Sequence, residues 1–263
     1  MKVKDINEHF LSRAPWVNRA NTVDRIKAGD PDKEVARCAV AWIPSLEAIR
    51  RAVEMGVDLL VCHEPTFYDH FDADPTATPI GAEKLEYLNK HGLAVLRNHD
   101  VWDVWPEVGI PWAWGKFLGL NGEAAAMNDS KTQHRHDIAP VPFGQFAKAV
   151  AARTATINEP LIEVNGDPDK LVSKIGVGTG CGCSVHDYQQ LGCDCFIVCD
   201  DGTNFWEHMQ IAEDLRIPVI CVNHCTSEEP GMVTMTQYIN DNIEGVAAEH
   251  IQQGCRFKVI GSD

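Results

Sequence analysis

Three absences narrow the class of protein that this sequence of 263 residues can encode. It contains no run of about 18 apolar residues, so no transmembrane helix is expected. The opening residues, Met1 to Asp5, lack the apolar core of a signal peptide, which makes a cytoplasmic location the default expectation. Basic residues are few: the chain has 23 Lys and Arg but 38 Asp and Glu. Because nucleic acids and anionic membranes are bound through Lys and Arg, neither is expected as a partner.

Disulfide bonds are not expected either, although the chain has ten cysteines. Such bonds belong mainly to secreted proteins, and this sequence shows no secretory signal. Several cysteines lie inside apolar strands, where a thiol behaves as a small hydrophobic group. Cys181 and Cys183 flank a glycine, a spacing that also occurs in metal sites, but a glycine-rich turn explains the pair better.

What the sequence does contain is an alternation of short apolar runs and helical patterns, typical of an α/β fold. Seven runs are predicted strands: 35–42, 58–61, 93–97, 161–164, 174–177, 194–199 and 219–222. Residues 122–142 show the clearest shift in composition and are predicted to be a linker, with His134 and His136 in solvent. Near the end of the chain, two helices (232–239 and 243–252) and a last strand (256–260) are expected.

A weak internal repeat accompanies this alternation. Residues 56–64 match residues 192–201 in pattern, and each segment precedes a helix and a short strand that ends in Asn-His. A duplicated αβ unit would explain the match, although any two βαβ units look alike. Both copies would carry polar residues at the ends of their strands, where open α/β sheets bind ligands.

Three strand ends offer a histidine together with a carboxylate. His63 and Glu64 are adjacent, whereas His99 and Asp103, like His224 and Glu228, are four residues apart. A spacing of four lets both side chains converge on one ion when the segment makes a single turn. One such pair is weak evidence, because most histidines only form hydrogen bonds. Three pairs, all at strand ends, favour a site for divalent metal ions.

The residues around these pairs resemble the NIF-three-like family, dinuclear metal proteins also called GTP cyclohydrolase type two-like. Four segments carry the resemblance and extend over nearly the whole chain: 2–15 with Gly29-Asp30-Pro31, 56–65, 99–109, and 223–231. In the family, these segments include a strand that ends in a His-His-Pro-like turn, a His-x-x-x-Asp segment and a Gly-His-x-x-Thr-Glu segment.

This resemblance implies two divalent ions as cofactors and a set of ligands for them. His63 and His224 would hold one ion, Glu64 and Asp103 the other, and Glu228 would bridge both. His99 would orient Asp103 or a bound water. The alternative bridging residue is Glu229, because the Thr-Ser-Glu-Glu segment differs from the Ala-Thr-Glu of the family.

The resemblance also implies the architecture. Two αβ domains of related topology are expected, with the metal site at the strand ends in the cleft between them. Residues 1–127 with 223–263 would form the outer domain, and residues 128–222 an inserted second domain. A homo-oligomer, specifically a ring-shaped hexamer whose sites face an inner cavity, is expected.

Glu64 is the main departure from the family, which usually has a second histidine there. An added carboxylate lowers the positive charge of the site and makes it harder. The sequence therefore favours Mn, Fe or Mg, with Zn as a further candidate.

These inferences predict a metal-dependent hydrolase in which a metal-bridging hydroxide attacks a small molecule. His99 or His208 would move the proton. Trp102 and Trp105 flank Asp103, either as a packed lid or as an aromatic wall for a flat substrate. An amide or cyclic C–N bond of a heterocyclic compound fits that wall. Nucleotide or phosphoester hydrolysis is one alternative, although no P-loop occurs; a non-catalytic metal-binding or carrier assembly is the other.

Overall fold

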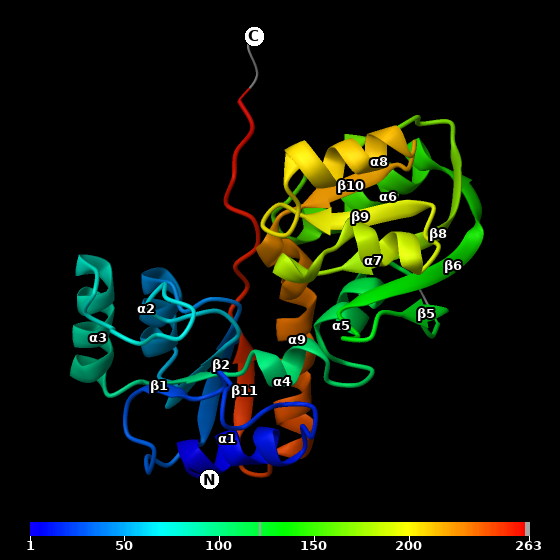
Figure 1. Ribbon diagram of the computed structural model, residues 1–263. Coiled ribbons are helices and arrows are strands. Elements are labelled where there is room, and N and C mark those ends of the chain that lie inside the picture. The colour runs from blue at the N-terminus through cyan, green and yellow to red at the C-terminus, as the bar shows by residue number, and fades with distance from the viewer. Residues whose placement is uncertain (121, 261–263) are drawn as a thin grey trace. The chain divides into compact units, whose positions relative to one another are not determined.

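The computed structural model describes residues 1–120 and 122–260 and divides the chain into two αβ units (Figure 1). The first unit comprises Met1–Gly109 and Met232–Gln252, and the second comprises Ile110–Gly231 and Gln253–Asp263. The predicted α/β class is confirmed. The boundaries differ from the expected 1–127 with 223–263 and 128–222, so that residues 223–231 join the middle of the chain.

The first unit is built on a five-stranded sheet in the order β1-β4-β3-β2-β11. β2 (Arg37–Ala41), β3 (Leu59–Cys62), β4 (Ala94–Arg97) and β11 (Ala247–His250) are parallel, and β1 (Ile26–Ala28) runs antiparallel to β4. The residues of β3 and β4 are fully buried, as in a parallel sheet that is covered on both faces. Cys62 lies opposite Arg97, so the two strands end side by side and bring the residues that follow them together.

The helices of the first unit are α1 (Val3–Ser12), α2 (Leu46–Glu54), α3 (Pro79–His91) and α4 (Asp100–Asp103). Their ends follow from the sequence. Ser45 caps α2 by accepting the amide of Ala48, and Thr78 caps α3 ahead of Pro79. Gly92 ends α3 in the left-handed conformation that glycine adopts without strain (φ 60°). These ends determine where the chain turns into the next strand.

The second unit is built on a six-stranded sheet in the order β5-β6-β8-β9-β10-β7. β8 (Leu171–Gly178), β9 (Cys195–Cys199) and β10 (Val219–Val222) are parallel. β5 (Ala126–Met127), β6 (Gln133–Pro142) and β7 (Glu163–Asn165) pair antiparallel at the two sides. The helices are α5 (Ile110–Phe117), α6 (Phe143–Thr154), α7 (Val185–Gln190), α8 (Gln210–Asp214) and the start of α9 (His224–Asn242).

The two units repeat one arrangement at their parallel strands. In the first unit, β3 and β4 are joined by α3, and in the second, β9 and β10 are joined through α8. Cys199 pairs with Val222 as Cys62 pairs with Arg97, so each pair of strands ends at one edge. The related topology of the two units is thereby confirmed. In both units, the histidine that follows the second strand stands at the start of a helix.

The predicted linker at 122–142 is wrong, because most of it is sheet. β6 pairs with β8 from Gln133 opposite Gly178 to Pro142 opposite Leu171. His134 and His136 are buried rather than solvated. The strand was not predictable from hydrophobic alternation, because it carries polar and ionisable side chains. Its buried imidazoles occupy core positions where strands usually have apolar residues.

The end of the chain also differs from the expectation. One helix, α9, replaces the helix predicted at 232–239 and begins earlier, and β11 replaces the helix predicted at 243–252. Residues 256–260 form no strand. Gly245 (φ 79°) turns the chain, and pairing with β2 decides the conformation of a segment whose pattern suits either state. Among the described residues, no helix combines the length and the apolar character needed to cross a membrane.

Burial of His134 should make the protein sensitive to acid. Burial lowers the pKa of this imidazole to about 4, although the carbonyl of Lys131, 3.0 Å away, opposes the shift. The pKa in the unfolded chain is about 6.5, so the unfolded state binds more protons between these values. The contribution of neutral His134 is complete above pH 6.5 and is lost as the pH falls towards 4, by at most about 3 kcal/mol.

Urea unfolding of the His134→Gln variant across this pH range checks the expectation. Glutamine keeps a buried hydrogen-bonding side chain but does not titrate, so the free energy of unfolding should depend less on pH than in the wild type. The matched control is His91→Gln, at an exposed position. An identical pH dependence in wild type and His134→Gln would assign the acid sensitivity to other groups.

Candidate metal-binding site

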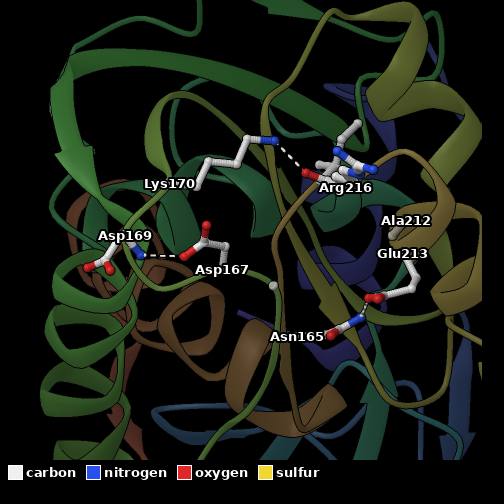
Figure 2. A pocket seen from close by; sticks show the side chains of 9 residues that line it. Asn165, Asp167, Asp169, Lys170, Ala212, Glu213 and Arg216 are labelled. Carbon is white, nitrogen blue, oxygen red and sulfur yellow. Dashed lines mark hydrogen bonds between the residues drawn. The ribbon is translucent and has the colours of Figure 1, made fainter.

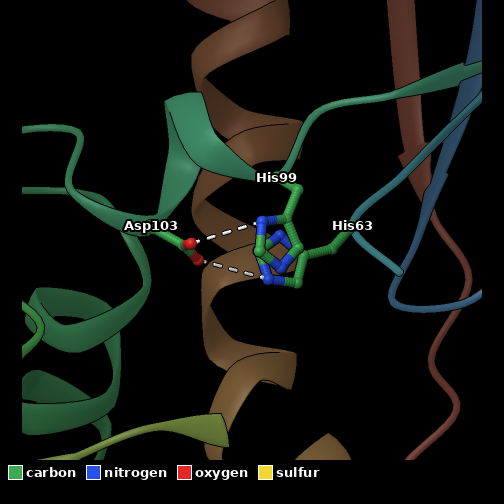
Figure 3. A group of neighbouring side chains, drawn as sticks. All are labelled: His63, His99 and Asp103. Carbon is green, nitrogen blue, oxygen red and sulfur yellow. Dashed lines mark ion pairs between the residues drawn. The ribbon is translucent and has the colours of Figure 1, made fainter. Parts of the chain in front are cut away.

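Two imidazoles and a carboxylate meet at the strand ends of the first unit (Figure 3). His63 follows β3, His99 follows β4, and Asp103 closes the short helix α4. The Asp103 carboxylate lies 3.4 Å from His63 Nε2 and 3.3 Å from His99 Nδ1. The two rings are stacked, with centroids 4.4 Å apart. One donor atom from each residue lies within 4.8 Å of the others, a spacing that allows all three to bind one ion.

The protonation of the His63 ring follows from its neighbours. Its Nδ1 lies 3.4 Å from the backbone carbonyl of Asn98, and a carbonyl only accepts. Nδ1 therefore carries the proton, and in the neutral ring Nε2 presents a lone pair. That lone pair faces the Asp103 carboxylate. Metal-binding histidines commonly show this arrangement, in which a backbone carbonyl fixes one nitrogen and leaves the other for the ion.

His99 is surrounded by acid. Burial lowers its pKa, but the charge of Asp103 and a hydrogen bond to Asp100 outweigh this and raise the pKa to about 9. His99 Nδ1 lies 3.0 Å from Asp100, whose own pKa falls to about 2 against the effect of burial because this imidazole is its main partner. In the absence of a bound cation, His99 is therefore an imidazolium at neutral pH and holds one oxygen of Asp103.

A buried carboxylate holds the helix that presents Asp103. Asp24, only 1% exposed, accepts the backbone amides of His99, Asp100 and Val101 at 2.5, 3.1 and 2.8 Å. These are the amides at the start of α4 that have no partner inside the helix. Burial raises the pKa of Asp24, and the amide hydrogen bonds oppose that rise. Asp24 thus fixes the backbone from which both His99 and Asp103 project.

Glu64 lies beside an arginine. The buried Arg97 guanidinium is 3.7 Å from the Glu64 carboxylate, and its Nε donates to the carbonyl of His63 at 2.8 Å. Arg97 also donates to the carbonyl of His70, in the loop that follows. One cation therefore ties the end of β4 to the turn after β3. The same cation offsets the charge that Glu64 adds relative to a histidine at this position.

The second unit holds another imidazole–carboxylate arrangement. His224 begins α9, and its Nε2 lies 3.1 Å from Glu228, one turn further along the helix. Its Nδ1 lies 2.8 Å from the carboxylate of Asp201, which follows β9. As in the first unit, an acceptor holds Nδ1 and Nε2 faces a carboxylate. The two expected ligands of this segment, His224 and Glu228, are thus brought together.

Acids fix the backbone of His224 as well. Asp200 accepts the amide of His224 and the side-chain amide of Asn223, at 2.9 and 2.8 Å. Glu159 accepts the backbone amide of Asn223 at 2.9 Å, and burial raises the pKa of Glu159. A carboxylate from another segment therefore holds the helix start in each unit, which keeps the candidate ligands in place.

Glu228 and Glu229 have different surroundings. Glu229 is fully buried and accepts the backbone amides of Gln253 and Gly254 at 3.0 and 3.4 Å. These hydrogen bonds tie the last segment of the chain to α9. Only Glu228 lies beside the ring of His224, and this difference favours Glu228 over Glu229 as a ligand.

His208, the other predicted proton carrier, lies apart from these groups. It belongs to a π-helical turn (Phe205–Met209), and its Nδ1 accepts the backbone amide of Asn204 at 3.2 Å. Among the described residues, it joins no cluster with the spacing of metal ligands. Its ring therefore accepts the backbone amide at the start of the turn to which it belongs.

Trp102, Trp105, Trp112 and Trp114 pack within the units rather than form an open wall. Trp102 is buried, and Trp102 and Trp105 pack against Phe10 and Tyr238 with ring centroids 4.9 to 6.1 Å apart. In the second unit, Trp114 stacks on Phe117 and Trp112 contacts His134. These contacts favour the packed lid over an aromatic wall for Trp102.

A separate hollow lies between β7 and α8 of the second unit (Figure 2). Its volume is about 640 Å³, and several of its polar side chains bind one another or the backbone. Asn165 donates to Glu213 at 2.8 Å, and Lys170 donates to the carbonyl of Arg216. No ligand candidate from the sequence lines this hollow, so its size alone does not make it the functional site.

Sequence reasoning missed the residues that hold the ligands. Asp24, Arg97 and Asp201 come from segments that carry no metal-binding motif. The signal for Asp201 was its place directly after a buried strand, as for His63. Asp24 and Arg97 gave no comparable signal, because only the fold brings them to α4 and to Glu64.

The chain belongs to the Duf34/NIF3 (NGG1p interacting factor 3) family, whose model matches residues 1–254. A curated relative from Clostridium perfringens, named GTP cyclohydrolase 1 type 2 homolog, is 24% identical over 251 residues, which cover 93% of each chain. A relative of the same name from Streptomyces coelicolor is 29% identical over 199 residues, covering 71% of this chain and 69% of that one.

Solved structures show the same fold. A hypothetical protein of Staphylococcus aureus superposes with a TM-score of 0.80 at 20% identity and 99% coverage of both chains. Reduced HcgD from Methanocaldococcus jannaschii superposes with a TM-score of 0.72 at 21% identity, covering 95% of this chain and 97% of that one. The predicted resemblance to the NIF-three-like family is thus confirmed.

Replacing Asp24 should loosen α4. Asp24→Ala leaves three backbone amides at a buried helix start without their acceptor, which should lower the free energy of unfolding by about 2–3 kcal/mol. Asp24→Asn keeps one oxygen acceptor and should lose roughly half as much. Urea unfolding measures both values; equal losses in the two variants would show that the amides do not depend on the carboxylate.

Gly180 and Gly182 offer a matched pair of substitutions beside His224. A Cβ at Gly180 (φ 50°) would lie 2.5 Å from both His224 Nε2 and Glu228 Oε1, whereas one at Gly182 would meet nothing nearer than 3.6 Å. Gly180→Ala should therefore destabilise the protein by more than about 1 kcal/mol and displace the imidazole. Gly182→Ala should stay within about 0.5 kcal/mol of the wild type. Urea unfolding and crystal structures of the variants check this; equal effects would contradict it.

Proposed function

We propose that the protein is a metal-dependent hydrolase that binds two divalent ions. The proposed ligands are His63, Glu64, Asp103, His224 and Glu228. One observation carries the proposal: in each unit, a strand-end imidazole has Nδ1 held by an acceptor and Nε2 turned to a carboxylate. A lone pair 3.1 to 3.4 Å from a carboxylate is unfavourable unless positive charge joins the two. A bound cation supplies that charge, and a second ring proton is the competing explanation.

The donor set fits the proposed ions. Neutral imidazole and carboxylate oxygen together suit borderline and hard divalent metals. Such ions, when bound, supply the Lewis acidity that activates water and polarises a substrate carbonyl or phosphoryl oxygen. The residues of the chain orient the ligands: the Asn98 carbonyl and Asp201 select the ring tautomers, and Asp24 and Asp200 hold the helix starts.

The choice of metal depends on Glu64. Its carboxylate makes the donor set harder than two adjacent histidines would, which supports Mn, Fe or Mg over Zn. The Arg97 guanidinium beside it offsets part of the added negative charge. The loss of Lewis acidity is therefore smaller than the ligands alone imply, and Zn remains a candidate.

His99 is the group proposed to move a proton. Its Nδ1 is held between Asp100 and Asp103, and these carboxylates raise its pKa. An imidazolium in this place can deliver a proton to a leaving group as a bond to it breaks. His208 remains the alternative carrier.

A small molecule with an amide or cyclic C–N bond is the proposed substrate. The relatives named GTP cyclohydrolase 1 type 2 homolog support hydrolysis at a heterocyclic ring. Nucleotide or phosphoester hydrolysis is the alternative within the same class. The net charge of −15 disfavours polyanionic substrates and nucleic acids.

A homo-oligomer, expected to be a hexamer, completes the proposal, together with a cytoplasmic location. Support for association comes from large apolar side chains that are exposed in the second unit. Phe205, Trp206 and Phe257 are each about three-quarters exposed, and a contact between subunits that buried them would remove apolar surface from water.

Metal content is the first test. Elemental analysis of the purified protein should find two divalent ions per chain, and His63→Asn and Glu228→Gln should each remove at least one. His208→Asn is the matched control and should keep the full content, because no donor cluster among the described residues contains it. Equal metal content in wild type and Glu228→Gln would refute the proposed ligand set.

Turnover is the second test. With Mn, Fe, Mg or Zn, the protein should hydrolyse a member of a panel of cyclic amides, esters, phosphoesters and nucleotides. His99→Asn should keep its metal while kcat falls by about 100-fold or more. Bound ions that exchange freely, combined with no turnover on any substrate, would instead support a non-catalytic metal carrier.

A further inference from the structure

Cys181 stands apart from the other cysteines. All ten lie within the described residues, and Cys181 alone is exposed, whereas its neighbour Cys183 is buried in the core. Core packing therefore explains Cys183 but not Cys181. The Cys181 thiol lies in a tight turn and is exposed to solvent, and its neighbours indicate which kind of ligand suits it.

Those neighbours are of types that commonly bind metal ions. The sulfur of Cys181, a carboxylate oxygen of Asp201 and a ring nitrogen of His224 all lie within 4.8 Å of one another. Sulfur, oxygen and nitrogen donors at this spacing are a usual donor set for a transition metal, whose ligands stand about 2.0–2.3 Å from the ion. The three residues come from three separate segments, so the fold and not a local motif brings them together.

The backbone of the turn is held against His224. Gly180 approaches the ring so closely that a Cβ there would lie 2.5 Å from Nε2, and its amide donates to the Ser227 hydroxyl at 3.3 Å. On the other side, Gly202 packs against the same turn, where a Cβ would lie 2.6 Å from the carbonyl of Gly180. The turn that carries Cys181 is thus packed between the segment after β9 and the start of α9.

We propose that Cys181 binds, as a thiolate, the divalent ion held at His224. The proposal rests on the metal binding proposed above and adds a sulfur ligand to it. On binding, the thiol proton passes to solvent and the sulfur lone pair bonds to the ion, with no change of oxidation state. A thiolate favours Zn²⁺ and Co²⁺ over Mn²⁺ and Mg²⁺. The ion at His224 would therefore be softer than the ion that Glu64 favours at the other place.

Cobalt provides a test that does not depend on activity. Co²⁺ added to the metal-free wild-type protein should produce the near-ultraviolet charge-transfer absorption of a cobalt–thiolate bond. Cys181→Ser should lose this absorption, and Cys255→Ser, at a half-buried cysteine of the same unit, should keep it. Zn²⁺ affinity of Cys181→Ser should fall by about tenfold or more, whereas Mn²⁺ affinity should stay within about twofold. Circular dichroism checks that each variant is folded.

Alkylation gives a second, independent measurement. Zn²⁺ should slow the modification of Cys181 by a thiol reagent, as followed by peptide mass spectrometry, while Cys255 reacts at an unchanged rate. Wild-type protein that binds Co²⁺ without the absorption, or whose absorption survives in Cys181→Ser, would overturn the thiolate ligand and leave the metal-binding proposal standing. Failure of the wild type to bind any divalent ion would overturn both.

Discussion

Two imidazole rings turned towards carboxylates are the constraint on which the candidate site depends. A neutral His63 or His224 would direct a lone pair at Asp103 or Glu228. Neither ring can avoid this by changing its tautomer, because the Asn98 carbonyl and the Asp201 carboxylate each accept the Nδ1 proton. The arrangement therefore requires positive charge at two places. The proposed metal centre would meet that requirement, since the electrostatics that would bind the cations also disfavour alternative ring orientations.

Several acids hold these rings and carboxylates in place. Asp24 in the first unit and Asp200 with Glu159 in the second accept backbone amides at the starts of α4 and α9. Asp24 and Glu159 are buried, and the cost of burying these two carboxylates is offset by hydrogen bonds from amides at the helix starts. The acidic composition thus serves two purposes: some carboxylates are candidate ligands, and others position them.

Opposing influences on metal preference coexist in the chain. Glu64 adds an oxygen donor, Arg97 offsets its charge, and Cys181 offers a sulfur beside His224. Oxygen and sulfur donors favour different ions, so the preference of the protein depends on the balance between them rather than on the histidines. Family membership leaves this balance open, because Glu64 departs from the family pattern and Arg97 and Cys181 lie outside the histidine motifs.

The predictable part of the fold came from local patterns. Apolar runs such as 194–199 predicted their strands, and Ser45 and Gly92 lie at helix ends that local sequence signals indicate. Where polar side chains entered the core, the patterns failed. β6, which carries the buried His134 and His136, was expected to be a linker. The segment of β11 was expected to be helical, but it pairs with β2 as a strand. Burial and strand pairing are long-range effects that a window of sequence does not contain.

By itself, the sequence determined the α/β class, the candidate ligand pairs at the ends of strands and the family. Each of these depends on residues that are close together along the chain, because spacing along a strand or one helical turn fixes which side chains share a face. Only the tertiary structure decided which groups surround each candidate ligand. Arg97 lies beside Glu64, Asp24 holds the start of the helix that carries Asp103, and Asp201 and Cys181 lie beside His224. These partners are brought together by folding over separations of many residues, and an electrostatic interaction depends on distance in space, not on distance along the chain.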